Sequence, residues 1–275
     1  MESRAEHEFS LALIGAGNMG GALLGGWLAD GIAGHRITVV DPAPRENMAD
    51  MVEALGVRHL ASAQGAAPAD VLVVAVKPQI LEQALAGARG MAGANTVTVS
   101  VAAGKSIATI AGALASPSAA VVRAMPNTPA LVRRGITVAC ASSYVSDDQR
   151  QRVDRLLRAV GSVEWVDDEN LLDAVTAVSG SGPAYVFLLA ECLAEAGAAI
   201  GLAPELAMKL ARETVSGAGE LMAKSEETPA RLRQNVTSPN GTTAAALSVL
   251  MGQNGLAELM RKAVEAAAKR ASELG

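Results

Sequence analysis

The stretch Leu13-Ile14-Gly15-Ala16-Gly17-Asn18-Met19-Gly20 decides the fold. It carries three glycines in the spacing G-x-G-x-x-G, directly after an apolar run that predicts a strand and directly before a run that predicts a helix. Glycines in this spacing permit a tight turn, the approach of a pyrophosphate to the backbone and close packing of helix on strand. Since both flanks fit, we expect a dinucleotide site over residues 15–20, with a purely structural glycine turn as the alternative.

Two residues near the end of the second predicted strand bear on which dinucleotide binds. Asp41 ends that strand 26 residues after Gly15, near where an acidic residue bonds the ribose 2′-hydroxyl of NADH. Arg45 follows a turn later, where it could pair with the 2′-phosphate of NADPH. The sequence therefore leaves the choice between NADH and NADPH open.

The composition excludes several classes of protein. The chain has 275 residues, of which 50% are hydrophobic and 19% charged, with a net charge of −5. This apolar content excludes intrinsic disorder, and the acidic balance argues against nucleic acid or an anionic membrane surface as a partner. The sequence predicts neither a disulfide framework nor a metal site. Its two cysteines, Cys140 and Cys192, are far apart, and its three histidines, His7, His35 and His59, lack the spacing of metal ligands.

Two segments bear on the cellular location of the protein. Residues 1–8 are too charged for a secretory signal, so we expect a cytoplasmic protein. The apolar run from Pro183 to Ala203 has the length of a membrane span, but Glu191 and Glu195 interrupt it at helical spacing. We predict a buried helix of a soluble protein, lying in a core or a subunit interface.

The pattern up to residue 166 is typical of an α/β domain with a doubly wound parallel sheet, a Rossmann-like fold. Short β-branched runs predict the strands Ser10–Ile14, Ile37–Val40, Val71–Val76, Thr96–Val101, Ala120–Arg123 and Gly135–Cys140. Helices are predicted at Gly20–Asp30 and Arg45–Leu55, each closed by a glycine, Gly31 or Gly56.

From residue 167 to 275 the strand pattern stops and an all-helical domain is predicted. Its expected helices are Glu169–Val178, Pro183–Ile200, Pro204–Lys224, Pro229–Gln234, Thr242–Met251 and Gly255–Leu274. Pro183, Pro204 and Pro229 each stand where a proline would be the first helical residue.

Three segments follow predicted strands at the edge where ligands bind in open α/β sheets. Lys77, within Ala75-Val76-Lys77-Pro78, is the first charge after an apolar run, and its alternative role is a solubilising residue. The small residues Ala102-Ala103-Gly104 suit backbone contact with a flat ring, or a plain turn. Asn127 lies between two prolines in a stiff polar loop, where it orients a ligand or caps its own backbone.

Two polar stretches interrupt the helical half, residues 178–183 (VSGSGP) and 236–243 (VTSPNGTT). The second places hydroxyls and free backbone N–H groups at a helix start, which favours an anion such as a carboxylate. The alternative is ordinary capping of that helix by Thr242 or Ser238. Both stretches are richer in Ser, Thr and Gly than a connection needs, which favours a functional role.

Together these motifs resemble the pyrroline-5-carboxylate reductase family, which acts in the last step of proline biosynthesis. The resemblance runs from about Ser10 to Leu274. Its most specific parts are residues 173–185 (DAVTAVSGSGPAY) and 236–243, supported by residues 75–78 (AVKP) and 125–129 (MPNTP). It implies a Rossmann-like domain for NAD(P)H and a helical domain that forms a homodimer, with dimers of this family often assembling further into decamers of five dimers.

The resemblance also implies site residues. It assigns the cofactor to residues 15–20, Asp41, Ser62, Val76, Lys77, the Ala102–Gly104 turn and, near the nicotinamide, Asn235. With Ala75, Pro78, Arg45 and Asn127, these make up the predicted cofactor set. The substrate, 1-pyrroline-5-carboxylate, is assigned to Glu226, Ser238, Thr242 and Thr243, with the loop coming from the partner subunit.

Reducing a cyclic imine needs a hydride donor and a proton on a basic nitrogen, but no strong general base. The motifs contain no histidine, and their hydroxyl and N–H groups suit positioning. We therefore predict Thr243 and Ser238 as catalytic residues, with Thr243 bonding the ring nitrogen and the backbone of Gly241 to Thr243 holding the carboxylate.

Two other functions remain as alternatives. A reductase related to the β-hydroxyacid dehydrogenases would use a lysine of the helical domain, but Lys209 and Lys224 lie in ordinary amphipathic surroundings. A non-catalytic NAD(P)H sensor would bind the nucleotide without turnover, and it gives no reason for the two polar stretches.

Overall fold

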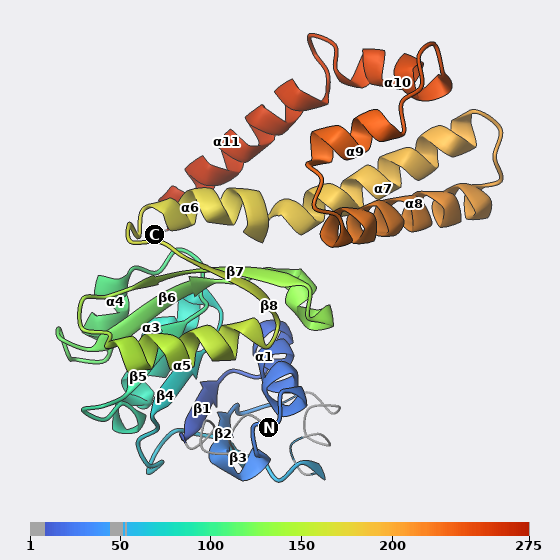
Figure 1. Cartoon of the computed structure of the whole chain (residues 1–275). Helices are drawn as coiled ribbons and strands as arrows, with labels where there is room; N and C mark the ends of the chain where they lie inside the picture. The colour runs from blue at the N-terminus through green and yellow to red at the C-terminus, as the bar shows by residue number, and fades with distance from the viewer. Residues whose placement is uncertain (1–8, 45–51, 53, 275) are drawn as a thin grey trace. The chain divides into compact units, whose positions relative to one another are not determined.

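The computed structural model describes residues 9–44, 52 and 54–274. These form two compact units, one made of the described residues up to Gly180 with residues 268–274, and the other of Ser181–Ala267 (Figure 1). The last strand ends at Trp165, next to the predicted domain boundary. The units divide later, at Gly180, because the helical turns that begin at Leu171 pack on the sheet.

The first unit contains a sheet of eight strands in the order β3-β2-β1-β4-β5-β6-β7-β8. Six of these strands were predicted, and their observed bounds differ by at most two residues; they are β1 (Leu11–Ile14), β2 (Ile37–Val40), β4 (Val71–Val74), β5 (Val97–Ser100), β6 (Ala120–Met125) and β7 (Gly135–Ala141). The two edge strands, β3 (Arg58–Leu60) and β8 (Gly161–Trp165), were not among them.

All pairings are parallel except that of β6 with β7, which is antiparallel. Only residues 126–134 connect these two strands, and they include the short helix η5 (Thr128–Val132). A parallel crossover needs a dozen or more residues, so this connection returns the chain in the opposite direction. The predicted α/β fold is confirmed, with this one departure from a purely parallel sheet.

Helices cover both faces of the sheet (Figure 1). One core contains Leu13 and Trp27 and involves α1 (Asn18–Ala29) and α5 (Asp147–Arg158). The other contains Leu72 and Leu85 and involves α3 (Leu81–Gly87) and α4 (Ile107–Ala113). Three further short helices are η2 (Gly34–Arg36), η3 (Pro78–Ile80) and η4 (Arg89–Met91).

A glycine follows each of the two helices predicted in the first half of the chain, and one of these helices lies mostly outside the described residues. Gly31 and Gly56 both have positive φ, of +89° and +68°, as expected of residues that follow a helix. Of the helix predicted at Arg45–Leu55, residues 45–51 and 53 lie outside the part of the chain that the structure describes.

A helical segment joins the sheet to the second unit. It begins with α6 (Leu171–Val175) and continues as the π-helix η6 (Thr176–Gly180). The helices of the second unit are α7 (Gly182–Ala199), α8 (Pro204–Lys224), α9 (Pro229–Asn235) and α10 (Thr242–Leu250), followed by α11 (Leu256–Leu274), whose last residues belong to the first unit. Pro204 and Pro229 begin helices as predicted, but Pro183 is the second residue of α7, because Gly182 already has helical geometry.

The apolar helix α7 is largely exposed in the single chain. It packs on α8 through small residues such as Ala194 and Ala207, while Phe187 is 63% and Leu188 57% exposed. The prediction of a buried helix is therefore wrong for one copy of the chain, and a subunit interface remains as its alternative. By length and composition, Leu171–Ala199 is the one helix among the described residues that could cross a membrane.

The starts of β1 and β4 are joined by a reciprocal set of hydrogen bonds. Asp70 Oδ2 accepts from the backbone N–H and from the hydroxyl of Ser10, both at 2.7 Å, and Ser10 Oγ accepts from the N–H of Asp70 at 3.0 Å. Burial raises the pKa of Asp70, but the bonds from Ser10 outweigh it, so that the pKa lies below 3.8. This pair therefore stabilises the fold while Asp70 is ionised.

We expect Ser10→Ala to lower the free energy of unfolding at pH 7 by about 1–2 kcal/mol, because it removes a hydrogen bond to a carboxylate. Because the pKa of Asp70 is lowered in the folded protein, its carboxylate stabilises the fold above pH 3.8. This contribution to the free energy of unfolding is lost as the pH falls through the folded pKa. The loss measured by urea unfolding should therefore shrink below pH 4, whereas that of Ser142→Ala, whose hydroxyl bonds only backbone, should not. A pH-independent loss in Ser10→Ala would contradict this account.

Candidate functional site

The glycine-rich turn after β1 brings helix and strand closer than any side chain allows. Gly15 has φ +89°, and a Cβ on Gly20 would lie 2.0 Å from the carbonyl oxygen of Gly15. A Cβ on Gly17, in contrast, would meet nothing within 4 Å. Gly15 and Gly20 are therefore required by the fold, whereas Gly17 leaves space that the protein itself does not fill.

A pocket of about 750 Å³ opens beside this turn. Its walls come from the ends of β1, β2 and β4, the residues after β3, and helix α3 with the preceding η3. Among the predicted cofactor residues, it is lined by Gly15, Gly17, Asp41, Ser62, Ala75, Val76 and Lys77. The structure thus brings together residues that are far apart in the sequence at one edge of the sheet, where doubly wound folds bind ligands.

Asp41 is held in a fixed position at the pocket wall. Its Oδ2 accepts from the N–H of Ala16 at 2.7 Å, and its Oδ1 accepts from the N–H of Ala43 at 2.9 Å. Its backbone carbonyl contacts His59 Nε2 at 2.8 Å. The carboxylate retains lone pairs for a ribose hydroxyl, and its charge opposes a phosphate in the same place.

The start of α1 suits an anion. Its N-cap residue is Gly17, which offers no side-chain cap, and its first turn has no acidic residue. The helix dipole at this N-terminus then favours a negatively charged group. The side-chain ammonium of Lys77, which also lines the pocket, has no hydrogen-bond or ion-pair partner among the described residues. The space above Gly17, the helix start and this lysine together fit a pyrophosphate.

The remaining predicted cofactor residues that the structure describes are not among those that line the pocket walls. Ala16 bonds Asp41, and Asn18, Met19 and Gly20 form the first turn of α1. Others lie at the same edge of the sheet: Pro78 begins η3, and Ala102, Ala103 and Gly104 follow β5. Arg45 lies outside the described residues.

Several pocket residues were not predicted from the sequence. These are Ile14, Val40, Pro42, Ala61, Ala63, Ile80, Gln83, Ala84 and Gly87. Val40 and Pro42 flank Asp41 and could have been found from that residue. The segment after β3 and the face of α3 carry no sequence motif that would place them at the pocket.

In the second unit, a tight turn precedes α10. The N–H of Gly241 donates to the carbonyl of Ser238 at 3.1 Å, and Asn240 has φ +60°. The N-cap residue of α10 is Gly241, and no side chain caps the helix, so capping by Thr242 or Ser238 is wrong as an alternative. The first N–H groups of α10, including those of Thr242 and Thr243, are therefore left for another partner.

The other predicted residues of this unit are exposed or bonded locally. Glu226 is exposed in the connection between α8 and α9. Asn235 is exposed at the end of α9, where its Nδ2 donates to Glu227 Oε2 at 2.7 Å. In one copy of the chain, both residues are open to solvent.

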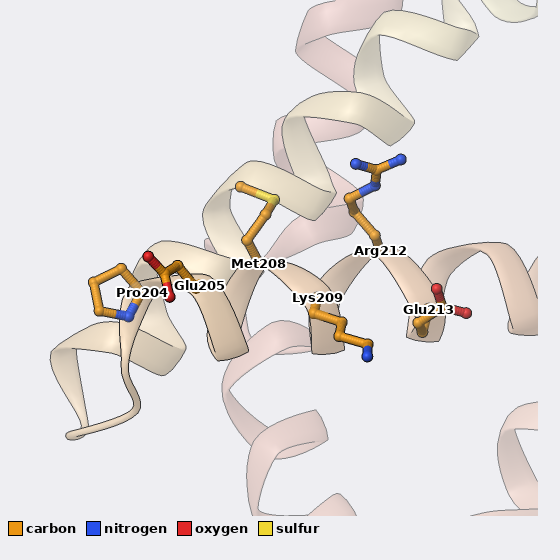
Figure 2. Close-up of a pocket in the computed structure, with 6 residues that line it drawn as sticks. All are labelled: Pro204, Glu205, Met208, Lys209, Arg212 and Glu213. Atoms are coloured by element: carbon orange, nitrogen blue, oxygen red, sulfur yellow. The ribbon is translucent and has the colours of Figure 1, made fainter.

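The two lysines weighed as acid–base groups lie on the surface of α8. Lys209 borders a hollow of about 700 Å³ that is lined by residues of this one helix, among them Glu205 and Glu213 (Figure 2). Lys224 forms an ion pair with Glu220 at 3.0 Å. Neither lysine therefore has the surroundings of a catalytic group.

Comparisons with known proteins decide the family. A family model described as pyrroline-5-carboxylate reductase dimerisation matches residues 169–274, and one described as NADP oxidoreductase, coenzyme F420-dependent, matches residues 10–104. The pyrroline-5-carboxylate reductase of Pseudomonas aeruginosa is 44% identical over 268 residues, which cover 96% of each protein. The chain belongs to the pyrroline-5-carboxylate reductase family.

Solved structures of this family have the same fold. A pyrroline-5-carboxylate reductase from Coxiella burnetii is 38% identical, with a TM-score of 0.90 over 97% of this chain and 98% of that one. The pyrroline carboxylate reductase of Plasmodium falciparum, solved with NADP bound, is 29% identical, with a TM-score of 0.82 over 98% and 99% of the two chains. The predicted resemblance to pyrroline-5-carboxylate reductases is confirmed.

The space above Gly17 gives a direct test of the pocket. Gly17→Ala should leave the unfolding free energy almost unchanged, because its methyl group meets no protein atom. It should weaken binding of NADH or NADPH at least about tenfold, because the methyl group would occupy the place of the pyrophosphate. Gly25→Ala, in α1 and equally free of contacts, is the matched control, with binding followed by calorimetry. Equal affinities of the two variants would show that the pyrophosphate lies elsewhere.

Proposed function

We propose that this protein reduces the cyclic imine 1-pyrroline-5-carboxylate to L-proline with NADH or NADPH. The observation that carries the proposal is 44% identity over nearly the whole length of a pyrroline-5-carboxylate reductase. The pocket beside the glycine turn supports it, since its shape and charges fit a dinucleotide. Neither a non-catalytic sensor nor a β-hydroxyacid dehydrogenase is favoured, because the relatives are named pyrroline-5-carboxylate reductases, and the two lysines considered for acid–base catalysis, Lys209 and Lys224, lie on the surface of α8.

The first unit would hold the cofactor. The backbone around Gly17 and the start of α1 bind the pyrophosphate, Asp41 bonds the adenosine ribose, and Lys77 balances phosphate charge. Ala75 and Val76 provide the apolar wall of the pocket. When bound, the nicotinamide supplies the hydride for the imine carbon.

The second unit would hold the substrate. The N–H groups of Thr242 and Thr243 bind its carboxylate at the start of α10, where the helix dipole favours an anion, whereas the N–H of Gly241 already donates to the carbonyl of Ser238. The hydroxyl of Thr243 bonds the ring nitrogen, and Ser238 and Glu226 complete the polar surroundings. Since a protonated imine needs no base, these groups act by orientation.

A second copy of the chain would complete this site. The exposed apolar residues of α7, such as Phe187, Leu188 and Leu189, form a surface that a soluble chain seldom leaves uncovered. A dimerisation family model matches the segment that contains them. We therefore propose a homodimer through the helical unit, with a decamer of five dimers as a further assembly and the cytoplasm as its location.

The reaction is tested by oxidation of NADPH and of NADH on addition of 1-pyrroline-5-carboxylate, with proline identified as product. Thr243→Ala should lower kcat/KM for the imine at least about tenfold, because a bond to the reacting nitrogen is lost, and Thr243→Ser should restore most of it. Ser248→Ala, whose hydroxyl bonds the carbonyl of Ala245 in the same helix, should have wild-type kinetics. An active Thr243→Ala would remove that residue from the mechanism, and an inactive wild type would contradict the reductase.

The choice of cofactor is tested at Asp41. Asp41→Asn keeps an oxygen for the N–H of Ala16 but removes the negative charge. We expect the ratio of kcat/KM for NADPH to that for NADH to rise about tenfold, because a like charge no longer opposes the 2′-phosphate. An unchanged ratio would mean that the 2′-phosphate lies away from Asp41.

A further inference from the structure

One face of β6 and its exit runs along the helical segment that leads out of the sheet. Arg123, Met125 and Asn127 alternate along the chain, and Asn127 keeps extended backbone angles of φ −127° and ψ 167°. Because side chains of an extended chain alternate between faces, all three point the same way. Each of them contacts the segment from Glu169 to Gly180.

Arg123 and Met125 contact this segment near its start and at its end. Arg123, only 8% exposed, forms ion pairs with Glu169 at 3.2 Å and with Asp173 at 3.3 Å. The methyl carbon of Met125 lies so near Gly180 that a Cβ there would be 2.6 Å away. These contacts fix the position of the segment along β6.

Asn127 bonds the backbone on both sides. Its Oδ1 accepts from the N–H of Ile136 at 2.9 Å, and its Nδ2 donates to the carbonyl of Ser179 at 3.1 Å. Both halves of the amide are therefore engaged within the first unit. Both of these contacts are with the protein's own backbone, and the predicted contact of Asn127 with the cofactor stays a prediction.

The carbonyl of Ser179 has a particular need for this donor. In a continued α-helix it would accept from the N–H four residues later, but that residue is Pro183, which has no N–H. The π-helix η6 ends at Gly180, immediately after it. A partly buried carbonyl left without a donor is costly, so an outside donor is required.

We infer that Asn127 is a positioning residue that replaces the N–H group missing from Pro183. Its amide lets the chain pass from α6 through η6 into α7 with Pro183 in place. It thereby fixes the small polar stretch Ser179–Gly182, through which the two units are joined. Pi-helical turns of this kind are frequent at functional sites.

The consequence for the reaction rests on the proposed function. The stretch that Asn127 fixes, Ser179–Gly182, belongs to one of the two polar stretches for which the sequence predicts a functional role. Neither Asn127 nor Ser179 lines the dinucleotide pocket. Loss of the bond should therefore lower kcat and leave cofactor affinity unchanged.

The test is a double-mutant cycle with Asn127→Asp and Pro183→Ala. Asn127→Asp keeps the acceptor for Ile136 and removes the donor to Ser179, whereas Pro183→Ala supplies an N–H to the same carbonyl. Asn127→Asp alone should raise the unfolding equilibrium constant and lower kcat, each by about fivefold or more, as expected for one lost hydrogen bond. In the Pro183→Ala background the same change should cost less than twofold in both quantities, whatever Pro183→Ala does by itself.

Ser142→Ala is the matched control. Its hydroxyl bonds the backbone of Val121 and Ala119 near the other end of β6, so it should affect stability without affecting kcat. Equal losses from Asn127→Asp in both backgrounds would overturn the inference, and so would a loss of stability with unchanged kcat. The unfolding cycle is measured without substrate. A failure of the proposed reaction, seen as an inactive wild type, is thereby distinguished from a failure of this inference.

Discussion

The structure depends on one close backbone contact, that between the carbonyl of Gly15 and the Cα of Gly20. A side chain at Gly20 would collide with that carbonyl, so helix α1 can begin against β1 only because both residues are glycines. This contact directs the uncapped start of α1 to the edge of the sheet where β1, β2 and β4 end. The same turn presents the N–H of Ala16 to Asp41, which fixes the carboxylate. Fold and cofactor pocket therefore have a common physical cause.

Strand β6 is the second place on which the arrangement depends. The short connection after it forces an antiparallel return in β7, and the stiff exit carries Asn127 to the joining helix. The buried thiol of Cys140, opposite Arg123 in β7, has a pKa raised by burial and then by Glu169, which disfavours the reactive thiolate. This region serves to hold the helix rather than to react.

Much of the first unit could be predicted from the sequence. Buried parallel strands appear in the sequence as runs of β-branched residues, and the spacing of the glycines indicates where helix and strand must approach closely. The edge strand β3 could not, since Arg58-His59-Leu60 has neither length nor alternation. The π-helix could not either, because it depends on a donor from Asn127, which is 52 residues away in the chain. The exposure of α7 could not be predicted for a different reason. Apolar periodicity indicates that a helix is covered, but not whether the same chain or a second copy covers it.

The central claim is that this chain transfers a hydride between a nicotinamide held in the first unit and an imine held by the second. The most direct measurement is the isotope content of proline formed from 1-pyrroline-5-carboxylate with cofactor deuterated at C4 of the nicotinamide. The account predicts one deuterium at proline C5, the former imine carbon, from one face of the nicotinamide only. Proline without deuterium, or oxidation of the cofactor without proline, would contradict it.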